Sequence, residues 1–298
     1  MSWRVRQLLL VAALAAAIGP AKAGPIVLHD SFDREVVLEA PARRIVTIFA
    51  SNTELVASLG LADRIVGIEA YTRFPPQVLD RPLVGGRLGF SVDAVVARAP
   101  DLVVVTPARQ AAHQLVDPMQ RLGIPILVLT HRSIAEVMDN IRLIARATGV
   151  DGEGAAVTDR LEARLAAVDA CLAGRARPRV VMITGTLGNG LMLVTRSDTY
   201  TGDAIEKAGG RHAFAGMTLL AQISPEAIIA ADPDVLLFAG RPADLAELVA
   251  RPGWRDMRAV RTQRAFTVPR AEFLIPGPRT VDGIERLAAL LHPAAAGR

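Results

Sequence analysis

The stretch Ser91–Leu102, SVDAVVARAPDL, recurs in the second half of the chain as Ser224–Val235, SPEAIIAADPDV. In both copies a serine precedes an acidic residue and an apolar run, which is the pattern of a capped helix start. In both copies Pro-Asp then separates the helix from an apolar run that is typical of a buried strand. Because the same unit occurs twice, we predict two similar lobes.

Short β-branched runs alternate with helical patterns on either side of each copy. Such alternation is typical of βα units in a mainly parallel sheet, which places the chain in the α/β class. The expected strands are Ile45–Phe49, Ile65–Ile68, Leu102–Val105 and Ile126–Leu129 in the first half, and Val180–Thr184, Val235–Phe238 and Ala265–Val268 in the second. Two flanking helices are also expected, Thr53–Leu59 with Ser51 or Asn52 as its cap, and Thr280–Leu291.

A single helix is predicted to join the lobes. Apolar residues recur every three or four positions in this segment, at Val157, Leu161, Leu165, Val168 and Leu172. One stripe at this spacing predicts a helix of about 30 Å over Glu153–Leu172. We therefore divide the chain into a leader (1–23), an N-terminal lobe (24–152), a linking helix (153–173) and a C-terminal lobe (174–298). A stiff connection of this kind predicts only a small opening motion.

The first residues have the features of a cleavable export signal. Arg4 and Arg6 precede an apolar run from Leu8 to Ile18, and Ala21-Lys22-Ala23 supplies the small residues that signal peptidase requires before Gly24. The run is shorter than the roughly 20 residues of a membrane-spanning helix. No cysteine lies at the cleavage site to accept a lipid, so we expect a soluble periplasmic protein.

Composition narrows the possible partners. Hydrophobic residues make up 51% of the 298-residue chain, which is enough for two cores. Removing the leader lowers the 34 basic residues to 31, against 30 acidic ones, so nothing indicates binding to nucleic acid or to a membrane surface. Cys171 is the single cysteine, which excludes an internal disulfide.

No motif supplies catalytic machinery. Gly185–Gly190 follows a strand, as a phosphate-binding loop would, but Leu191–Val194 is typical of a second strand, which favours a hairpin turn at Asn189-Gly190. Neither a Gly-x-Ser-x-Gly elbow nor a His-Glu-x-x-His helix is present, and the histidines at 29, 113, 131, 212 and 292 have no metal-ligand spacing. We expect no catalytic residue, resident metal or cofactor. A periplasmic metal-dependent enzyme is the alternative from another class.

Six arginines follow predicted strands, at the edge where open α/β sheets bind ligands. They are Arg73, Arg87, Arg109, Arg196, Arg241 and Arg270. Guanidinium groups around a cleft favour an anionic ligand with carboxylate or catecholate oxygens. A GC-rich genome is the competing explanation, because arginine supplies nearly all the positive charge of the predicted mature chain. We expect two or three of the six to contact ligand.

Several segments together resemble the class III periplasmic binding proteins of iron-siderophore, haem and cobalamin importers. They are Ile45–Gly60 with Ser51-Asn52-Thr53-Glu54-Leu55, Arg64–Ile68, Pro100–Val104, Gly209-Gly210 and Gly277-Pro278-Arg279. The resemblance covers essentially the whole predicted mature chain. It implies two lobes bridged by one long helix, and a monomer that delivers a metal chelate to an inner-membrane ABC permease with its ATPase.

The first lobe looks closest to the cobalamin-binding members of that family. Ala70–Pro76 is similar to their loop whose tyrosine contacts the corrinoid, which makes Tyr71 the leading ligand contact. Packing between Tyr71 and the following prolines is the structural alternative. The tryptophans that hold cobalamin in those members correspond here to Arg87 and Leu220.

Arginine in place of a flat aromatic wall favours a ferric siderophore, with cobalamin second and haem third. The expected ligand contacts are Tyr71, Arg73, Arg87, Phe90, Arg109, Arg196, Arg270 and Phe273.

The repeated acids have a role implied by the same resemblance. In this family one carboxylate on each lobe pairs with arginines of the permease, and Asp93 and Glu226 match those positions. An acid in a first helical turn also favours the helix dipole by about 0.3–1 kcal/mol without any partner. Both explanations remain open from the sequence.

Overall fold

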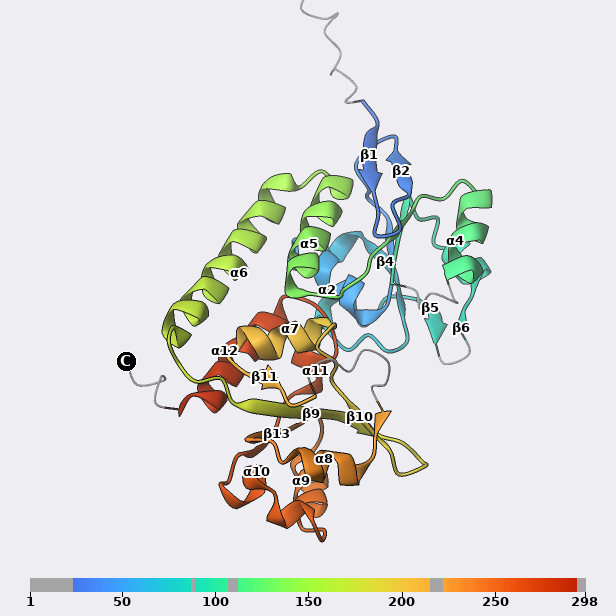
Figure 1. Ribbon diagram of the computed structural model, residues 1–298. Helices are drawn as coiled ribbons and strands as arrows, with labels where there is room; N and C mark the ends of the chain where they lie inside the picture. The colour runs from blue at the N-terminus through green and yellow to red at the C-terminus, as the bar shows by residue number, and fades with distance from the viewer. Residues whose placement is uncertain (1–23, 87–88, 107–111, 215–221, 294–298) are drawn as a thin grey trace, which may run out of the picture.

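The fold contains two six-stranded sheets, one in each half of the chain (Figure 1). The structure is a computed structural model, and it describes residues 24–86, 89–106, 112–214 and 222–293. In spatial order the N-terminal sheet contains β6 (Gly89–Phe90), β5 (Leu83–Gly86), β4 (Ile65–Glu69), β3 (Ile45–Ile48), β7 (Leu102–Val105) and β8 (Ile126–Val128). The C-terminal sheet contains β12 (Gln222–Ile223), β10 (Met192–Val194), β9 (Arg179–Thr186), β13 (Val235–Phe238) and β14 (Ala265–Thr267), with β11 (Arg211–His212) also paired to β9.

Both sheets are mainly parallel, and their central strands are buried. The β5–β6, β9–β10 and β10–β12 pairs are antiparallel, whereas the pairs around β3 and β13 are parallel. All four residues of β3, β7 and β13 are buried, as expected of parallel strands covered on both faces. The predicted two-lobed α/β fold is confirmed.

The repeated sequence forms the same unit in each lobe. Ser91 caps α3 (Val92–Val96) by accepting from the Ala94 amide at 3.1 Å, and Ser224 caps α8 (Pro225–Ala231) by accepting from the Ala227 amide at 3.3 Å. The aspartates of the two Pro-Asp pairs also have matching roles. Asp101 accepts from the Arg43 and Arg44 amides just before β3, and Asp234 accepts from the Arg179 amide at the start of β9, each at 2.8 Å. Each aspartate thus ties its own strand to the neighbouring strand.

Helices pack around both sheets. In the first half they are α2 (Ala50–Ser58), α4 (Ala112–Arg121) and α5 (Ile134–Thr148), with 3-10 turns η1 (Ala62–Arg64) and η2 (Pro76–Val78). In the second half they are α7 (Tyr200–Lys207), α9 (Pro242–Val249), α10 (Arg258–Arg261), α11 (Arg270–Phe273) and α12 (Arg279–Leu291), with η3 (Trp254–Asp256). A hairpin of β1 (Ile26–His29) and β2 (Glu35–Leu38) projects from the N-terminal lobe (Figure 1).

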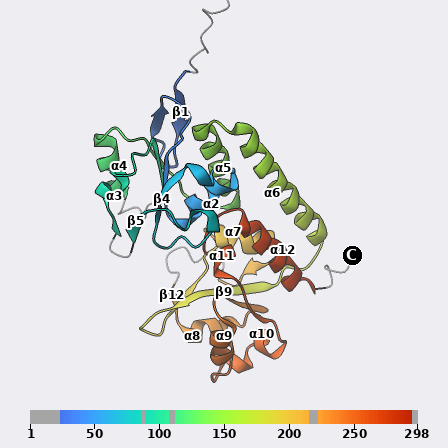
Figure 2. The ribbon, with the colours of Figure 1, turned by 180° about the vertical axis from the view of Figure 1, so that it is seen from behind.

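The linking helix α6 runs from Asp151 to Leu172, so it begins two residues before the predicted start. It passes along one side of the molecule from the first lobe to the second (Figures 1 and 2). Near its start, a Cβ on Gly154 would lie 2.4 Å from that of Ala145, so glycine permits the close approach of α5 and α6. Farther along, Arg164 pairs with Asp282 and Glu285 of α12, each at 2.6 Å. Both lobes therefore hold the same helix.

The beginning of α2 differs from the prediction. Neither Ser51 nor Asn52 caps this helix, because it already begins at Ala50, and Phe49 is its N-cap with φ of 77°. The Asn52 amide is used elsewhere, since it donates to the Ile48 carbonyl at 2.6 Å and to the Thr106 hydroxyl at 3.1 Å.

The glycine-rich segment Gly185–Gly190 follows the prediction. It joins β9 to the antiparallel β10, and the Leu187 amide donates to the Leu191 carbonyl at 2.8 Å. The predicted hairpin turn is confirmed. Within the described ranges, no helix combines the length and the apolar character that crossing a membrane requires.

Candidate ligand-binding site

A cavity of about 410 Å³ lies between the two lobes. The N-terminal lobe contributes Phe49, Ala50, Ser51, Glu69, Tyr71, Thr106 and His131, and the C-terminal lobe contributes Tyr200, Leu274, Ile275 and Pro276. The residues from the first lobe lie at or just after the carboxyl ends of β3, β4, β7 and β8. Open α/β sheets bind ligands at this edge, so the cavity is the candidate site.

Aromatic and apolar side chains from both lobes form much of its wall. Phe49 is 37% exposed and Tyr71 is 53% exposed, so both rings are accessible at the cavity. Phe49 packs against Phe90 with ring centroids 6.0 Å apart, so Phe90 supports the wall from the edge of the N-terminal sheet. On the opposite lobe, burial raises the pKa of the Tyr200 phenol above its ordinary value. Tyr200 therefore stays neutral.

Phe49 holds a strained backbone conformation. A φ of 77° is costly for any residue with a Cβ, and such strain of about 1–3 kcal/mol persists mainly at functional sites. The strain turns the chain at the end of β3 and leaves the Phe49 ring facing the cavity. Phe49 therefore lines the cavity from a strained turn.

His131 belongs to a hydrogen-bonded chain in the cavity wall. Its Nδ1 lies 3.1 Å from the Asn140 amide nitrogen, and its Nε2 lies 3.1 Å from the Thr106 hydroxyl, which donates to the Asn52 carbonyl oxygen at 3.2 Å. Burial lowers the pKa of His131 to about 4, so the ring is neutral. Asn140 can only donate through its nitrogen, which makes Nδ1 the acceptor and Nε2 the protonated nitrogen. Both ring nitrogens are thus engaged.

Glu69 lies at the end of β4 and is 5% exposed. Burial raises the pKa of its carboxyl, while the Ala50 amide and the Arg73 guanidinium act in the opposite direction. Ala50 is the first residue of α2, which has no side-chain cap of its own. The Glu69 carboxylate therefore occupies the positive end of the helix dipole.

An ion pair between Glu54 and Arg279 joins the two lobes. Arg279, the first residue of α12, donates to Glu54 Oε2 from Nε at 2.9 Å and from Nη2 at 2.6 Å. Glu54 lies on α2 and is 3% exposed. The Arg279 guanidinium also lies 4.2 Å from the centroid of the Phe74 ring, in the loop that carries Tyr71. A Cβ on Gly277 would lie 2.9 Å from Glu54 Oε1, so glycine permits this approach.

A family model described as periplasmic binding protein matches residues 45–271 of the chain. The chain belongs to this family. It is 26% identical over 274 residues to an uncharacterised ABC transporter substrate-binding lipoprotein of Bacillus subtilis, covering 90% of this chain and 86% of that one. It is 28% identical over 281 residues to a cobalamin-binding protein of Halobacterium salinarum, covering 90% and 74%. A solved haem-binding protein of Roseiflexus matches with a TM-score of 0.72 and 26% identity, over 85% of this chain and 99% of that one.

Six arginines of this periplasmic binding protein were predicted as candidate ligand contacts. The four that the structure describes instead bind carbonyl or carboxylate groups of the protein itself. Arg73 donates to the Ala70 and Thr72 carbonyls, and Arg270 donates to the Thr184 and Ala239 carbonyls. Arg196 pairs with Asp198, and Arg241 pairs with Asp244. None of these four is among the residues that line the cavity. Arg87 and Arg109 lie outside the described residues.

The predicted aromatic contacts fall in different places. Tyr71 lines the cavity and Phe90 packs beside it. Phe273, by contrast, is 0% exposed, because its side chain fills the core of the C-terminal lobe between α11 and α12. We therefore leave Phe273 out of the proposed site.

Of the residues that line the cavity, only Tyr71 was in the sequence-based set; those it missed include Phe49, Glu69, His131 and Tyr200. The available signal was positional, because Phe49 ends a predicted strand, Glu69 directly follows one, and His131 comes two residues after another. His212 and His292, in contrast, are buried in the C-terminal lobe, where each Nε2 lies near a carbonyl, of Gly202 at 3.4 Å and of Gly209 at 3.3 Å. Within the described residues, no group of three or more His, Cys, Asp or Glu is placed to hold a metal ion.

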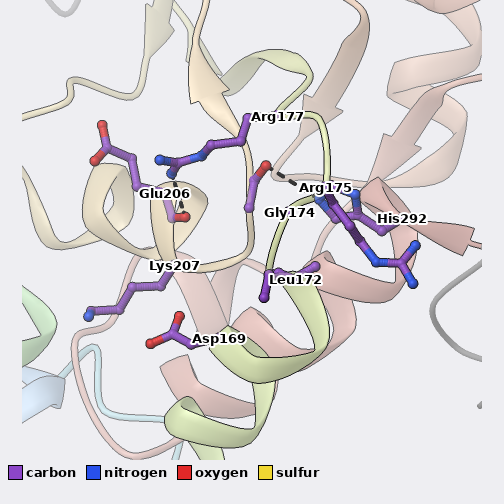
Figure 3. Close-up of a pocket in the computed structure, with 10 residues that line it drawn as sticks. Asp169, Leu172, Gly174, Arg175, Arg177, Glu206, Lys207 and His292 are labelled. Carbon is purple, nitrogen blue, oxygen red and sulfur yellow. Dashed lines mark hydrogen bonds between the residues drawn. The ribbon is translucent and has the colours of Figure 1, made fainter.

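A second cavity, of about 280 Å³, lies where α6 ends (Figure 3). Its two arginines donate to main-chain carbonyls: Arg175 to that of Cys171 at 3.0 Å, and Arg177 to that of Glu206 at 2.7 Å. Its lining residues Ala173, Gly174, Arg175 and Arg177 precede β9, so it lies at the amino end of that strand. This is the edge away from the ligand-binding ends of the strands, and we do not assign it a ligand.

The repeated acids Asp93 and Glu226 are both exposed. Each lies in the first turn of its short helix, α3 or α8. The two helices are in different lobes, on the side of the molecule away from α6 (Figure 2). The two carboxylates are therefore available to a partner that spans both lobes.

Proposed function

We propose that this protein is the periplasmic substrate-binding component of an ABC importer and that its ligand is a corrinoid. The observation that carries the proposal is the inter-lobe cavity, whose wall combines Phe49, Tyr71 and Tyr200 with an apolar segment of the second lobe. Flat aromatic surfaces from two sides suit a large, flat ligand. A corrinoid also needs no metal ligand from the protein, since its own ring and axial groups hold the cobalt.

The positions of the charges favour a corrinoid over the ferric siderophore that the sequence suggested. That ranking depended on arginines, and the four described arginines donate to carbonyls or carboxylates of the protein. The acidic side chain in the cavity wall is Glu69, which would repel a polyanionic catecholate chelate. Haem fits less well, because both nitrogens of His131 are engaged and Glu69 would repel propionates.

A ferric siderophore remains the second candidate. Arg73 favours it, because this exposed guanidinium lies in the same loop as Tyr71 and close enough to Glu69 to influence its pKa. A chelate lying over that loop would meet one cation. A hydroxamate chelate, which carries less negative charge than a catecholate, suits this arrangement better.

The direct test is calorimetric titration of the chain from Gly24 onward, the predicted mature start. We expect cyanocobalamin to bind with a Kd of about 1 μM or below, roughly −8 kcal/mol. Tyr71→Ala should weaken binding at least tenfold, whereas Arg241→Ala, which removes an exposed arginine outside the cavity, should leave it unchanged. Binding of a ferric hydroxamate or catecholate with no binding of cyanocobalamin would reverse the ranking.

We further propose that Asp93 and Glu226 dock on arginines of a membrane permease, which a cytoplasmic ATPase drives. Their exposure on equivalent helices of the two lobes supports this role. Charge reversal at both acids should abolish uptake in cells while ligand affinity stays unchanged. Reversal at Glu39 and Asp159, which are exposed elsewhere, is the matched control. Normal uptake by the Asp93→Arg, Glu226→Arg variant would exclude docking through these acids.

A further inference from the structure

Glu69 is a buried acidic residue in the wall of the cavity between the lobes. It ends β4, is 5% exposed and faces the space between the lobes. The described lining includes no lysine or arginine, and His131 is neutral because its pKa is about 4. The acid therefore has no cationic partner within the lining.

The Ala50 amide at the start of α2 and the Arg73 guanidinium both favour the charged form of Glu69. The neutral His131 and the phenols of Tyr71 and Tyr200 line the same cavity. A free helix N-terminus normally attracts an anion, including a carboxylate of a ligand. Here the protein's own carboxylate already takes that position, so α2 is closed to an anionic group of the ligand.

We propose that Glu69 selects the charge of the ligand, accepting hydrogen bonds from amide N–H groups and rejecting carboxylate or catecholate groups at the same position. This proposal rests on the corrinoid function and deepens it, because the corrin edge of cobalamin carries amide side chains. An amide donor gains a charge-assisted hydrogen bond from the carboxylate, whereas a ligand carboxylate meets like charge in a partly desolvated site.

The test compares two ligands that differ by one group: cyanocobalamin and its monocarboxylic acids, in which one edge amide is hydrolysed. The wild-type protein should bind the amide form at least tenfold more tightly than at least one of the acids. In Glu69→Gln this preference should fall to threefold or less, because glutamine keeps the shape but not the charge. Glu69→Asp should retain the preference, and Glu39→Gln is the matched control for charge away from the cavity.

A second pair of probes makes the test independent of the corrinoid assignment: a ferric trihydroxamate and a ferric tricatecholate. Glu69→Gln should improve binding of the tricatecholate relative to the trihydroxamate by about tenfold. Thermal unfolding followed by circular dichroism checks that each variant is folded.

The outcomes separate the two proposals. Unchanged ratios for both pairs in folded Glu69→Gln would overturn the charge role while leaving any observed corrinoid binding intact. Altered siderophore ratios without corrinoid binding would keep the charge role and reject the proposed ligand. A wild-type protein that binds none of these probes would overturn both.

Discussion

Loss of the Glu54–Arg279 ion pair should uncouple the two lobes, and Arg279→Met is the variant that tests it. Arg279 provides three hydrogen bonds to Glu54, counting its main-chain amide at 3.3 Å, and its guanidinium covers the Phe74 ring. Glu54 is 3% exposed, so methionine leaves its buried carboxylate without a cationic partner and, among the described residues, with only the main-chain amide of residue 279 as a donor. Breaking such a pair from one side costs about 3–5 kcal/mol.

A double-mutant cycle separates the ion pair from packing. Glu54→Gln should cost less than Arg279→Met, roughly 1–2 kcal/mol, because a neutral acceptor remains and no charge is left buried. Glu54→Leu combined with Arg279→Met should recover most of the loss, since two apolar groups can pack where two charges met. Arg241→Met is the control, because its pair with Asp244 is exposed, and it should leave stability unchanged.

Denaturation in guanidinium chloride reports on each lobe. Trp254 is 3% exposed in the C-terminal lobe and is the single tryptophan of the predicted mature chain, so its fluorescence follows that lobe, whereas far-ultraviolet circular dichroism follows both. We expect the two curves to coincide in the wild type and to separate in Arg279→Met. The reasoning is refuted if Arg279→Met unfolds with coincident curves and loses less than about 0.5 kcal/mol.

Three further predictions concern the site and the linking helix. Because burial holds the pKa of His131 near 4 while an unfolded chain binds this proton near 6.5, stability should fall by up to roughly 3 kcal/mol as pH drops between these values. His131→Gln should remove that part of the loss in denaturant titrations at pH 7 and pH 5. Phe49→Gly and Phe49→Ala should weaken ligand binding equally, but the glycine variant should be about 1 kcal/mol more stable in thermal unfolding, because glycine accepts a φ of 77°. Amide hydrogen exchange should be slow across Val157–Leu172, since both lobes pack on α6, and fast exchange there would contradict a rigid connection.

Local features predicted the elements well. Ser91 and Ser224 cap their helices as expected, because a serine hydroxyl reaches an amide three residues ahead whatever lies elsewhere in the chain. The same reasoning was wrong at Ser51 and Asn52. There the Asn52 side chain bonds to Thr106, 54 residues away, and Glu69 approaches the first helical amide in place of a local cap.

The candidate site was harder to predict, because its members are distant in sequence. Tyr71 was found through resemblance of its loop, whereas Glu69, two residues earlier, has no local pattern that marks it as a cavity residue. The arginines illustrate the opposite problem. Arg270 follows a strand, as a ligand contact would, yet its guanidinium donates to the Thr184 carbonyl, 86 residues away.

The sequence by itself determined the duplicated βα unit, the parallel strands and the helix between the lobes, because caps, breakers and apolar periodicity act within a few residues of the chain. Only the tertiary structure decided which charges are neutralised inside the protein and which face the ligand. An arginine or a glutamate is the same residue in the sequence whether its charge is paired inside the protein or faces the ligand. Which of the two occurs depends on which strand ends the fold brings close to that side chain.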